Sequence, residues 1–300
     1  MPKLILDYIY EHETQRANQV IMTQPLGQGK VQDYTWAQAV DQARRMAAHL
    51  QSRGFEPGSR IAILSKNTAH FMMAEMAIWM AGYTTVAIFP TEGADTIKYV
   101  LEHSGASLLF IGKLDAFGPQ APGIPADLPC IALPLSPKTA HETWDSITAK
   151  TAPLGGKPAR KPEDLALLMY TSGSTGTPKG VMHSFANATA AAEGIVAYQD
   201  AQMGKDFTYR VLSYLPLAHI FERAWVECAG FVMGRGHVFF AESLDTFLAD
   251  LQRARPTVFI SVPRLWLKFQ QGVFTKMPAK KLDRLLSIPI LGRIVAKKVL

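Results

Sequence analysis

The chain has 300 residues, of which 48% are hydrophobic and 19% are charged. This length and composition exclude a disordered chain and allow one large or two medium domains with a sizeable core. The net charge of +6 is compatible with a nucleic acid, an anionic membrane or a phosphorylated substrate, and it selects none of them.

Two features bear on the compartment in which the protein works. Cys130 and Cys228 lie far apart in the chain, which fits neither a metal-ligand spacing nor a disulfide framework, so we expect a reducing, cytoplasmic environment. The opening MPKLILDYIY is too short for a secretory signal. Residues 71–89 are the most membrane-like stretch. They contain Glu75 and Gly82 and end in β-branched residues, which favours a buried helix and strand over a membrane span.

The first third of the chain alternates between helical and strand patterns. Thr35 is a candidate N-cap, and apolar residues then recur at helical spacing until Gly54. Further patterns predict strands at residues 60–64, 86–89 and 106–112 and helices at 67–81 and 96–104. Fully apolar strands that alternate with helices predict a parallel sheet covered on both faces.

The second half repeats this alternation after an interruption. Residues 118–162 hold nine of the 19 prolines, which predicts a surface excursion or a junction between subdomains. Strands are then expected at residues 165–171, 210–216, 237–241 and 257–263. We therefore predict an α/β protein with a first α/β region at about residues 1–160 and a second at 161–300.

Residues 170–181, YTSGSTGTPKGV, carry the strongest chemical signal. Three glycines allow backbone N–H groups to converge on one point and form an anion nest. Thr171, Ser172, Ser174 and Thr175 add hydroxyl donors, and Lys179 adds a mobile positive charge. The candidate phosphate-binding residues are Thr171, Ser172, Gly173, Ser174, Thr175, Gly176, Lys179 and Gly180.

The expected surroundings of this loop are a strand before it and a helix after it, as in phosphate-binding loops of α/β proteins. It is not a Walker A loop, because Pro178 and Gly180 stand where that pattern needs glycine and a hydroxyl residue. The alternative is a surface loop rich in small residues. The combination of hydroxyls, glycines and a closing Pro-Lys-Gly favours the phosphate-binding interpretation.

The segment TSGSTGTPKG resembles the phosphate-binding signature of the adenylate-forming superfamily, which includes acyl-CoA synthetases, peptide-synthetase adenylation domains and luciferases. The resemblance implies that the loop holds the ATP triphosphate while a substrate carboxylate attacks the α-phosphate. Thr171 matches the threonine that helps to hold Mg²⁺, and Lys179 matches the loop lysine, for which a catalytic role is implied.

Residues 213–223, SYLPLAHIFER, look like a stretch of long-chain acyl-CoA synthetases. His219 matches a family residue close to the acyl carboxylate and the adenylate, where an imidazole can donate to an anionic oxygen. The residues alone favour another interpretation, in which His219 caps the helix that begins there. Glu222 and Arg223 either support His219 or form a structural pair, and we favour the structural role.

Similarity to the family extends over most of the chain, including residues 34–67, 88–110 and 262–269. Later motifs of the family are not found: the aromatic-Gly-x-Thr-Glu segment, the ribose-binding aspartate, the basic hinge and the C-terminal lysine. The resemblance therefore implies two doubly wound α/β subdomains of a large N-terminal domain that is incomplete at the C-terminus, without the C-terminal lid domain. We expect this chain to be inactive alone.

By the same resemblance, the intact enzyme would use a fatty acid, ATP with Mg²⁺, and coenzyme A, and would bind no nucleic acid. It would form acyl-AMP and then acyl-CoA. Two alternatives stay open: another carboxylate-adenylating enzyme of short-chain, aryl or peptide-synthetase type, and a non-catalytic fragment that binds an acyl chain or a nucleotide.

Two further features allow more than one interpretation. Residues 264–300 carry nine Lys or Arg and one Asp, so a basic face could contact the inner face of an anionic membrane, although a solvated helix surface is the simpler interpretation. Trp225 and Phe231 follow His219 and either border an acyl tunnel or belong to the core.

Overall fold

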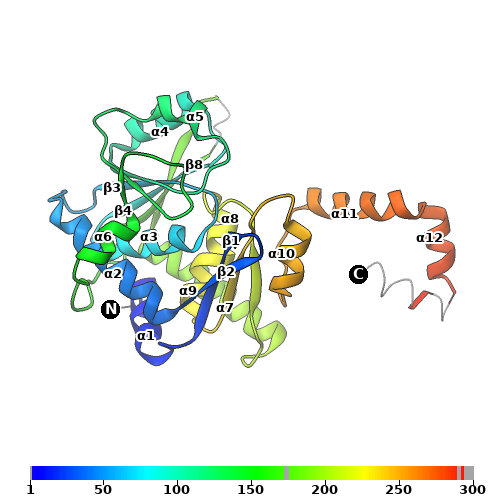
Figure 1. Cartoon of the computed structure of the whole chain (residues 1–300). Coiled ribbons are helices and arrows are strands. Elements are labelled where there is room, and N and C mark those ends of the chain that lie inside the picture. The colour runs from blue at the N-terminus through cyan, green and yellow to red at the C-terminus, as the bar shows by residue number, and fades with distance from the viewer. Residues whose placement is uncertain (1, 172–175, 289–291, 294–300) are drawn as a thin grey trace. The chain divides into compact units, whose positions relative to one another are not determined.

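The computed structural model describes residues 2–171, 176–288 and 292–293 (Figure 1). It contains two compact units, residues 1–258 and 259–300. The helices of the first unit are α1 (Ile5–Gln15), α2 (Trp36–Ser52), α3 (Ala69–Met80), α4 (Ala94–Ser104), α5 (Phe117–Gln120), η1 (Ala121–Gly123), α6 (Trp144–Lys150), α7 (Phe185–Met203), α8 (Ile220–Glu222), the π-helical η2 (Arg223–Cys228), α9 (Ala229–Met233) and α10 (Phe247–Ala254). The second unit has α11 (Pro263–Lys276) and α12 (Ala279–Leu286).

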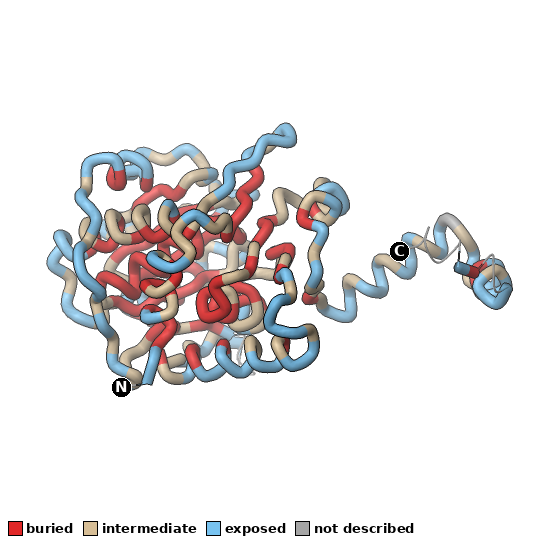
Figure 2. The backbone as a smooth tube through the Cα atoms, turned by 90° about the horizontal axis from the view of Figure 1, so that it is seen from below, coloured by how far each residue is buried: buried red, intermediate tan, exposed pale blue. Residues whose placement is uncertain are grey.

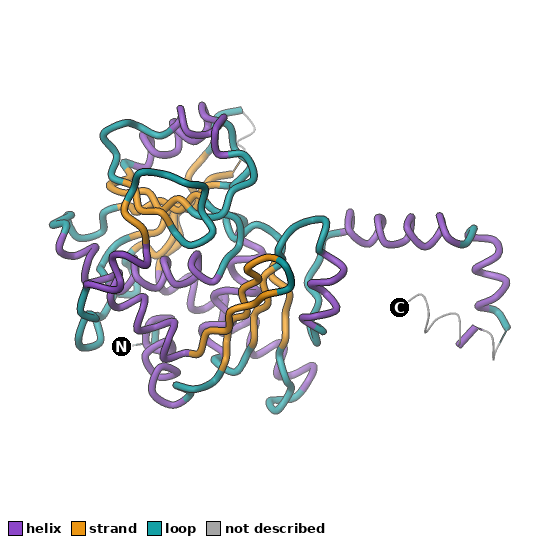
Figure 3. The backbone as a smooth tube through the Cα atoms, in the orientation of Figure 1, coloured by secondary structure: helices purple, strands orange, loops and turns teal. Residues whose placement is uncertain are grey.

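The strands of the first unit lie in two groups (Figure 3), which are a seven-stranded and a four-stranded sheet. They are β1 (Val20–Gly27), β2 (Lys30–Thr35), β3 (Arg60–Leu64), β4 (Thr84–Ile88), β5 (Ala106–Ile111), β6 (Cys130–Ala132), β7 (Glu142–Thr143), β8 (Leu165–Thr171), β9 (Lys179–Ser184), β10 (Arg210–Ser213) and β11 (His237–Phe240). The predicted α/β class is confirmed.

The seven-stranded sheet has the order β7-β6-β5-β3-β4-β8-β9, and all its neighbouring strands are parallel except β8 and β9. The chain moves from β3 to β4 in one direction and then crosses back to β5 on the other side of β3. Because such crossovers are right-handed, this reversal places α3 and α4 on opposite faces of the sheet. The sheet is therefore doubly wound, with Ile97 and Leu101 of α4 packed in one core cluster with Leu64, Val86 and Leu109.

The four-stranded sheet has the order β10-β11-β1-β2, with β10, β11 and β1 parallel and β2 antiparallel. Each sheet takes strands from both sides of residue 160, since β1 pairs with β11 and β4 pairs with β8. The division of the chain at about residue 160 therefore does not coincide with the sheets. The β1–β2 hairpin was not predicted, because Pro25 interrupts β1 and the KVQDYT sequence of β2 is mostly polar.

Helix α3 explains the membrane-like hydropathy of residues 71–89. All twelve residues of α3 are buried, and so are all five of β4, as predicted for a buried helix and strand. Buried residues, red in Figure 2, fill the interior of the first unit. Within the described ranges we find no helix with both the length and the apolar character that crossing a membrane requires.

The structure corrects two predictions outside the site. Residues 118–162 are more than a surface excursion, because β6 and β7 extend the seven-stranded sheet and α6 buries Trp144 and Ile147. These strands have only three and two residues, which is too short to give a periodic pattern. Residues 257–263 do not form the predicted strand, and α11 begins at Pro263, where a proline is favourable in the first turn of a helix.

Candidate active site

The carboxyl ends of β4 and β8 lie side by side in the seven-stranded sheet, with Ala87 in register with Met169. Phe89 lies two residues after Ala87, and Thr171 lies two residues after Met169. The ring of Phe89 packs edge-on against the ring of His219, with the centroids 6.4 Å apart. His219 therefore lies at the carboxyl end of the seven-stranded sheet, as does the start of the phosphate-binding loop. Open α/β sheets bind ligands at the carboxyl ends of their strands.

Of the eight candidate loop residues, Ser172, Gly173, Ser174 and Thr175 lie outside the described residues. Thr171 ends β8, and Lys179 opens β9 directly opposite it in antiparallel register. Both residues are exposed. The loop thus joins two strands of a hairpin, and helix α7 follows only after β9. The predicted passage from strand to helix is wrong, because the short edge strand KGVMHS has no apolar run that marks it.

The base of this hairpin packs closely. The Tyr170 hydroxyl lies 2.8 Å from Nδ1 of His103, and burial raises the pKa of Tyr170. A Cβ atom at Gly180 would lie 3.0 Å from Cδ1 of Leu168 and 3.3 Å from Cζ of Tyr170. Gly180 therefore leaves room for the Tyr170 ring. Gly176 has φ +83°, a left-handed conformation that glycine adopts without strain.

His219 caps helix α8 and is exposed. Its Nδ1 accepts a hydrogen bond of 3.1 Å from the backbone N–H of Phe221, as the capping interpretation predicts. An accepting Nδ1 places the proton of a neutral imidazole on Nε2. The cap therefore leaves Nε2–H as the donor that can meet an anionic oxygen, so the capping role and a role at the site are compatible.

Asn67 holds the segment that leads to His219. It follows β3, whereas the segment follows β10 of the other sheet. The Asn67 Nδ2 group donates to the Leu215 carbonyl at 2.6 Å and to the Ser213 hydroxyl at 2.8 Å. Its Oδ1 accepts from the Leu217 N–H at 2.9 Å. One side-chain amide thereby fixes Ser213, Leu215 and Leu217. It also joins the chain that follows β3 in one sheet to the chain that follows β10 in the other.

Glu222 closes this arrangement on the far side of His219. Its Oε1 accepts a hydrogen bond of 2.7 Å from the Ser213 hydroxyl. Burial raises the pKa of Glu222 to about 8, although hydrogen bonds from Ser213 and the Tyr214 backbone act in the opposite direction. Glu222 is 1% exposed and is hydrogen-bonded to the segment that precedes His219, so it stabilises this turn from within the fold.

Arg223 is not paired with Glu222, which corrects that part of the prediction. Its fully buried guanidinium contacts the carboxylates of Glu75 in α3 and, at 3.1 Å, Glu227 in η2. Its Nε donates to the Leu217 carbonyl at 2.8 Å, and its guanidinium lies 4.9 Å from the centre of the Phe71 ring. Burial raises the pKa of Glu227, and the charge of Arg223 acts against this.

Sequence reasoning missed Asn67 and the partner of Arg223. Glu75 gave a signal, since a single acidic residue within an otherwise apolar helix needs a buried partner. Asn67 gave none, because its partners lie about 150 residues away in the chain.

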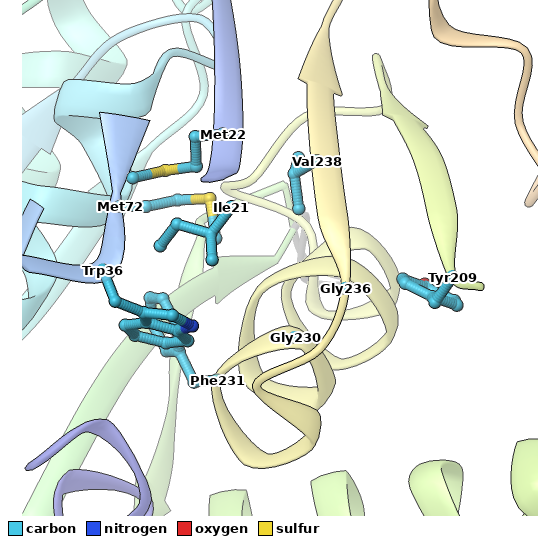
Figure 4. Close-up of a pocket in the computed structure, with 9 residues that line it drawn as sticks. All are labelled: Ile21, Met22, Trp36, Met72, Tyr209, Gly230, Phe231, Gly236 and Val238. Atoms are coloured by element: carbon cyan, nitrogen blue, oxygen red, sulfur yellow. The ribbon is translucent and has the colours of Figure 1, made fainter. Parts of the chain in front are cut away.

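Phe231 belongs to the core and not to a tunnel. Its ring packs against those of Trp36 and Trp79, with centroids 6.4 Å and 6.2 Å apart. The adjacent cavity (Figure 4) has a volume of about 10 Å³, enough for no more than about one water molecule. Its lining residues are Ile21, Met22, Trp36, Met72, Tyr209, Gly230, Phe231, Gly236 and Val238. Trp225 does not line it and packs against Phe221 and Tyr198.

Comparison with known proteins decides the family. The profile of the family described as AMP-binding enzyme matches residues 10–297. The chain belongs to this family.

Among the described residues, no group of three or more His, Cys, Asp or Glu side chains could hold a metal ion.

Several relatives in this family are fatty acyl-CoA synthetases. Fatty acyl-CoA synthetase A of Dictyostelium discoideum is 34% identical over 264 residues, which cover 83% of this chain and 39% of that protein. The long-chain-fatty-acid–CoA ligase FadD15 of Mycobacterium tuberculosis is 31% identical over 267 residues, which cover 87% of this chain and 44% of the ligase. The chain thus spans about two fifths of the length of these relatives.

Solved structures support the fold. The adenylation domain of a carboxylic acid reductase from Segniliparus rugosus, in complex with AMP, has a TM-score of 0.75 and 18% identity, and covers 92% of this chain. An anthranilate CoA ligase in complex with anthranoyl-AMP has a TM-score of 0.74 and 20% identity, and covers 86%. This chain covers 51% and 50% of those two structures. The architecture is therefore that of the N-terminal domain of adenylate-forming enzymes.

The raised pKa of Glu222 predicts a pH dependence of stability. Between the ordinary value of 4.5 and about 8, the folded state keeps a proton that the unfolded chain releases. This contribution is fully present below that window, and stability falls as the pH rises through it. Glu222→Gln keeps a neutral group at this position, so it should flatten the fall in urea midpoint between about pH 5 and about pH 8.5.

Glu163→Gln is the matched control, because Glu163 is exposed and lies outside this cluster. It should leave the wild-type dependence unchanged. The same slope for Glu222→Gln and the wild type would show that Glu222 is not the titrating group.

Proposed function

We propose that the intact protein activates a long-chain fatty acid with ATP and transfers the acyl group to coenzyme A. In the first reaction a carboxylate oxygen attacks the α-phosphate, which gives acyl-AMP and releases pyrophosphate. In the second the coenzyme A thiol attacks the acyl carbon, loses its proton and releases AMP. One observation carries the proposal: His219 lies at the carboxyl end of the seven-stranded sheet, where Thr171 and Lys179 flank the loop.

The first reaction brings two anions together, so charge neutralisation and positioning carry most of the catalysis. The loop residues from Thr171 to Gly180 would hold the triphosphate through backbone N–H groups and hydroxyls, and Lys179 would add a positive charge. The exposed ends of β8 and β9 leave both Thr171 and Lys179 accessible to a substrate. Bound Mg²⁺ would neutralise phosphate charge, with the Thr171 hydroxyl as its protein ligand.

His219 would act through Nε2–H. With Nδ1 occupied by the cap, this group can donate to an oxygen of the carboxylate or of the adenylate, where negative charge must be stabilised. The ring stays oriented because the cap and the packing of Phe89 hold two of its sides. The fatty acid preference is supported by the segment at residues 213–223 and by the names of the relatives.

Loss of the loop lysine should damage ATP use selectively. In the intact enzyme, Lys179→Ala should lower kcat/KM for ATP by about 10²-fold, because one preorganised charge is removed from the phosphates. The ratio of rates with two different fatty acids should not change, since Lys179 contacts no acyl group in this proposal. Acid-dependent ATP–pyrophosphate exchange measures both quantities.

Lys205→Ala is the matched control for this experiment. Lys205 is an exposed lysine in the loop before β10, away from the hairpin, so its loss should leave ATP kinetics as in the wild type. Unaltered ATP kinetics in Lys179→Ala would contradict the proposed role of the loop.

We also propose a cytoplasmic enzyme that contacts an anionic membrane peripherally through its second unit. Helix α12 carries Lys280, Lys281 and Arg284, and the exposed Leu286 and Ile288 follow closely. A basic face beside apolar side chains suits an anionic lipid surface, which is also where a fatty acid partitions.

Co-sedimentation with liposomes tests this contact. We expect the protein to bind vesicles that contain anionic lipid at low salt and to be released at high salt, because screening weakens the attraction. Triple substitution of Lys280, Lys281 and Arg284 by glutamine should abolish binding. Failure of the wild type to bind anionic vesicles at low salt would rule the contact out.

A further inference from the structure

We propose that Asn67 is a positioning residue for His219. Through the segment at residues 213–219, Asn67 holds His219 at the carboxyl end of the seven-stranded sheet. This inference rests on the role proposed above for His219, and it adds a residue from the opposite sheet to the site. Asn67 itself would touch neither substrate. It would act by fixing the backbone that carries the imidazole.

The geometry of the Asn67 amide supports this role. An amide has two N–H hydrogens, and the contacts of 2.6 Å to Leu215 and 2.8 Å to Ser213 account for both. The contact to Glu222 is longer, at 3.4 Å, and is therefore secondary. Together with the bond that Oδ1 accepts from Leu217, the side chain uses its full donor capacity on a stretch of five residues. Asn67 is only 8% exposed, so water does not readily replace these bonds.

The segment is also held by hydrogen bonds at His219 itself, toward the residues before it and after it. The His219 N–H donates to the Pro216 carbonyl at 2.8 Å, and the Arg223 N–H donates to the His219 carbonyl at 3.1 Å. The bond between Ser213 and Glu222 joins the residues on either side of the turn. With the turn closed in this way, two side chains fix where the turn as a whole lies. The Asn67 amide holds it relative to β3, and Arg223, whose Nε donates to the Leu217 carbonyl at 2.8 Å, holds it relative to α3.

No other residue type reproduces these contacts. Leucine matches asparagine in size but would leave the Leu215 carbonyl and the Leu217 N–H without their partner in a buried place. Aspartate can accept from Leu217, but it has no donor for Leu215 and would bring a second carboxylate beside Glu222. The requirement is therefore for an amide, and for one of this length.

Hydrogen exchange of this 300-residue chain tests the structural step without any need for catalysis. In Asn67→Leu, amides of residues 214–221 should exchange roughly tenfold faster, because a buried hydrogen-bond partner is lost. Amides of helix α2 should exchange as in the wild type. The control is Asn187→Ala, at an exposed asparagine in α7, which should change neither region.

Kinetics of the intact enzyme test the consequence. We expect Asn67→Leu to lower kcat for adenylate formation by about 10²-fold, the effect of a displaced catalytic group, with KM for ATP changed by less than about 2-fold. Asn67→Ser retains one donor and should show a smaller loss of the same kind. It also replaces Asn67→Leu in both experiments if that variant does not fold.

Three results would overturn the inference. Unchanged exchange at residues 214–221 would show that Asn67 does not fix the segment. Faster exchange in α2 as well would show general destabilisation instead of positioning. Local loosening with an unchanged kcat would show that the position of His219 does not matter for the reaction. Absence of adenylation in the wild type would instead refute the proposed function and leave the exchange result valid.

Discussion

The buried guanidinium of Arg223 constrains the centre of the molecule. A charge with no exposure to solvent is tolerated only where partners surround it, and Glu75, Glu227 and the Leu217 carbonyl supply them. Glu75 belongs to α3, which links two strands of the seven-stranded sheet, whereas Arg223 follows the strand β10 of the other sheet. The position of Arg223 therefore decides how the segment around His219 lies against α3.

This arrangement makes the site depend on the whole first unit. The seven-stranded sheet supplies the carboxyl ends of its strands at Thr171 and Phe89, and the four-stranded sheet supplies the segment that carries His219. Both sheets combine strands from distant parts of the chain, so neither half can form its share of the site alone. The two candidate groups also differ in their support. His219 is held by a network of buried polar residues, whereas Lys179 is exposed at the start of an edge strand.

Local patterns predicted the elements that are apolar and long enough to show a period. The N-cap at Thr35, the buried helix α3 and the strands β3, β4, β5 and β8 were predicted with small errors at their ends. The β1–β2 hairpin, β6, β7 and β9 were missed, because they are polar, interrupted or very short. Pairing with neighbours fixes such strands, and the chain on its own carries little record of that pairing.

The candidate site shows the same limit. The composition of the loop at residues 171–180 favours phosphate binding over a plain surface loop, because glycines and hydroxyls are combined there with a closing Pro-Lys-Gly. The hairpin that carries the loop, and the contacts of Asn67, arise from residues far apart in the chain. That the two interpretations of His219 are compatible could also be seen only in the structure, in which the cap occupies Nδ1 and leaves Nε2.

The most direct test of the account is acid-dependent ATP–pyrophosphate exchange by the intact enzyme, with a panel of long-chain, short-chain and aryl acids. We expect exchange that requires Mg²⁺ and is fastest with long-chain acids. Fastest exchange with a short-chain or aryl acid would retain adenylation but contradict the proposed substrate. Absence of exchange with every acid in the panel would contradict the central claim that the site at the carboxyl end of the seven-stranded sheet activates carboxylates.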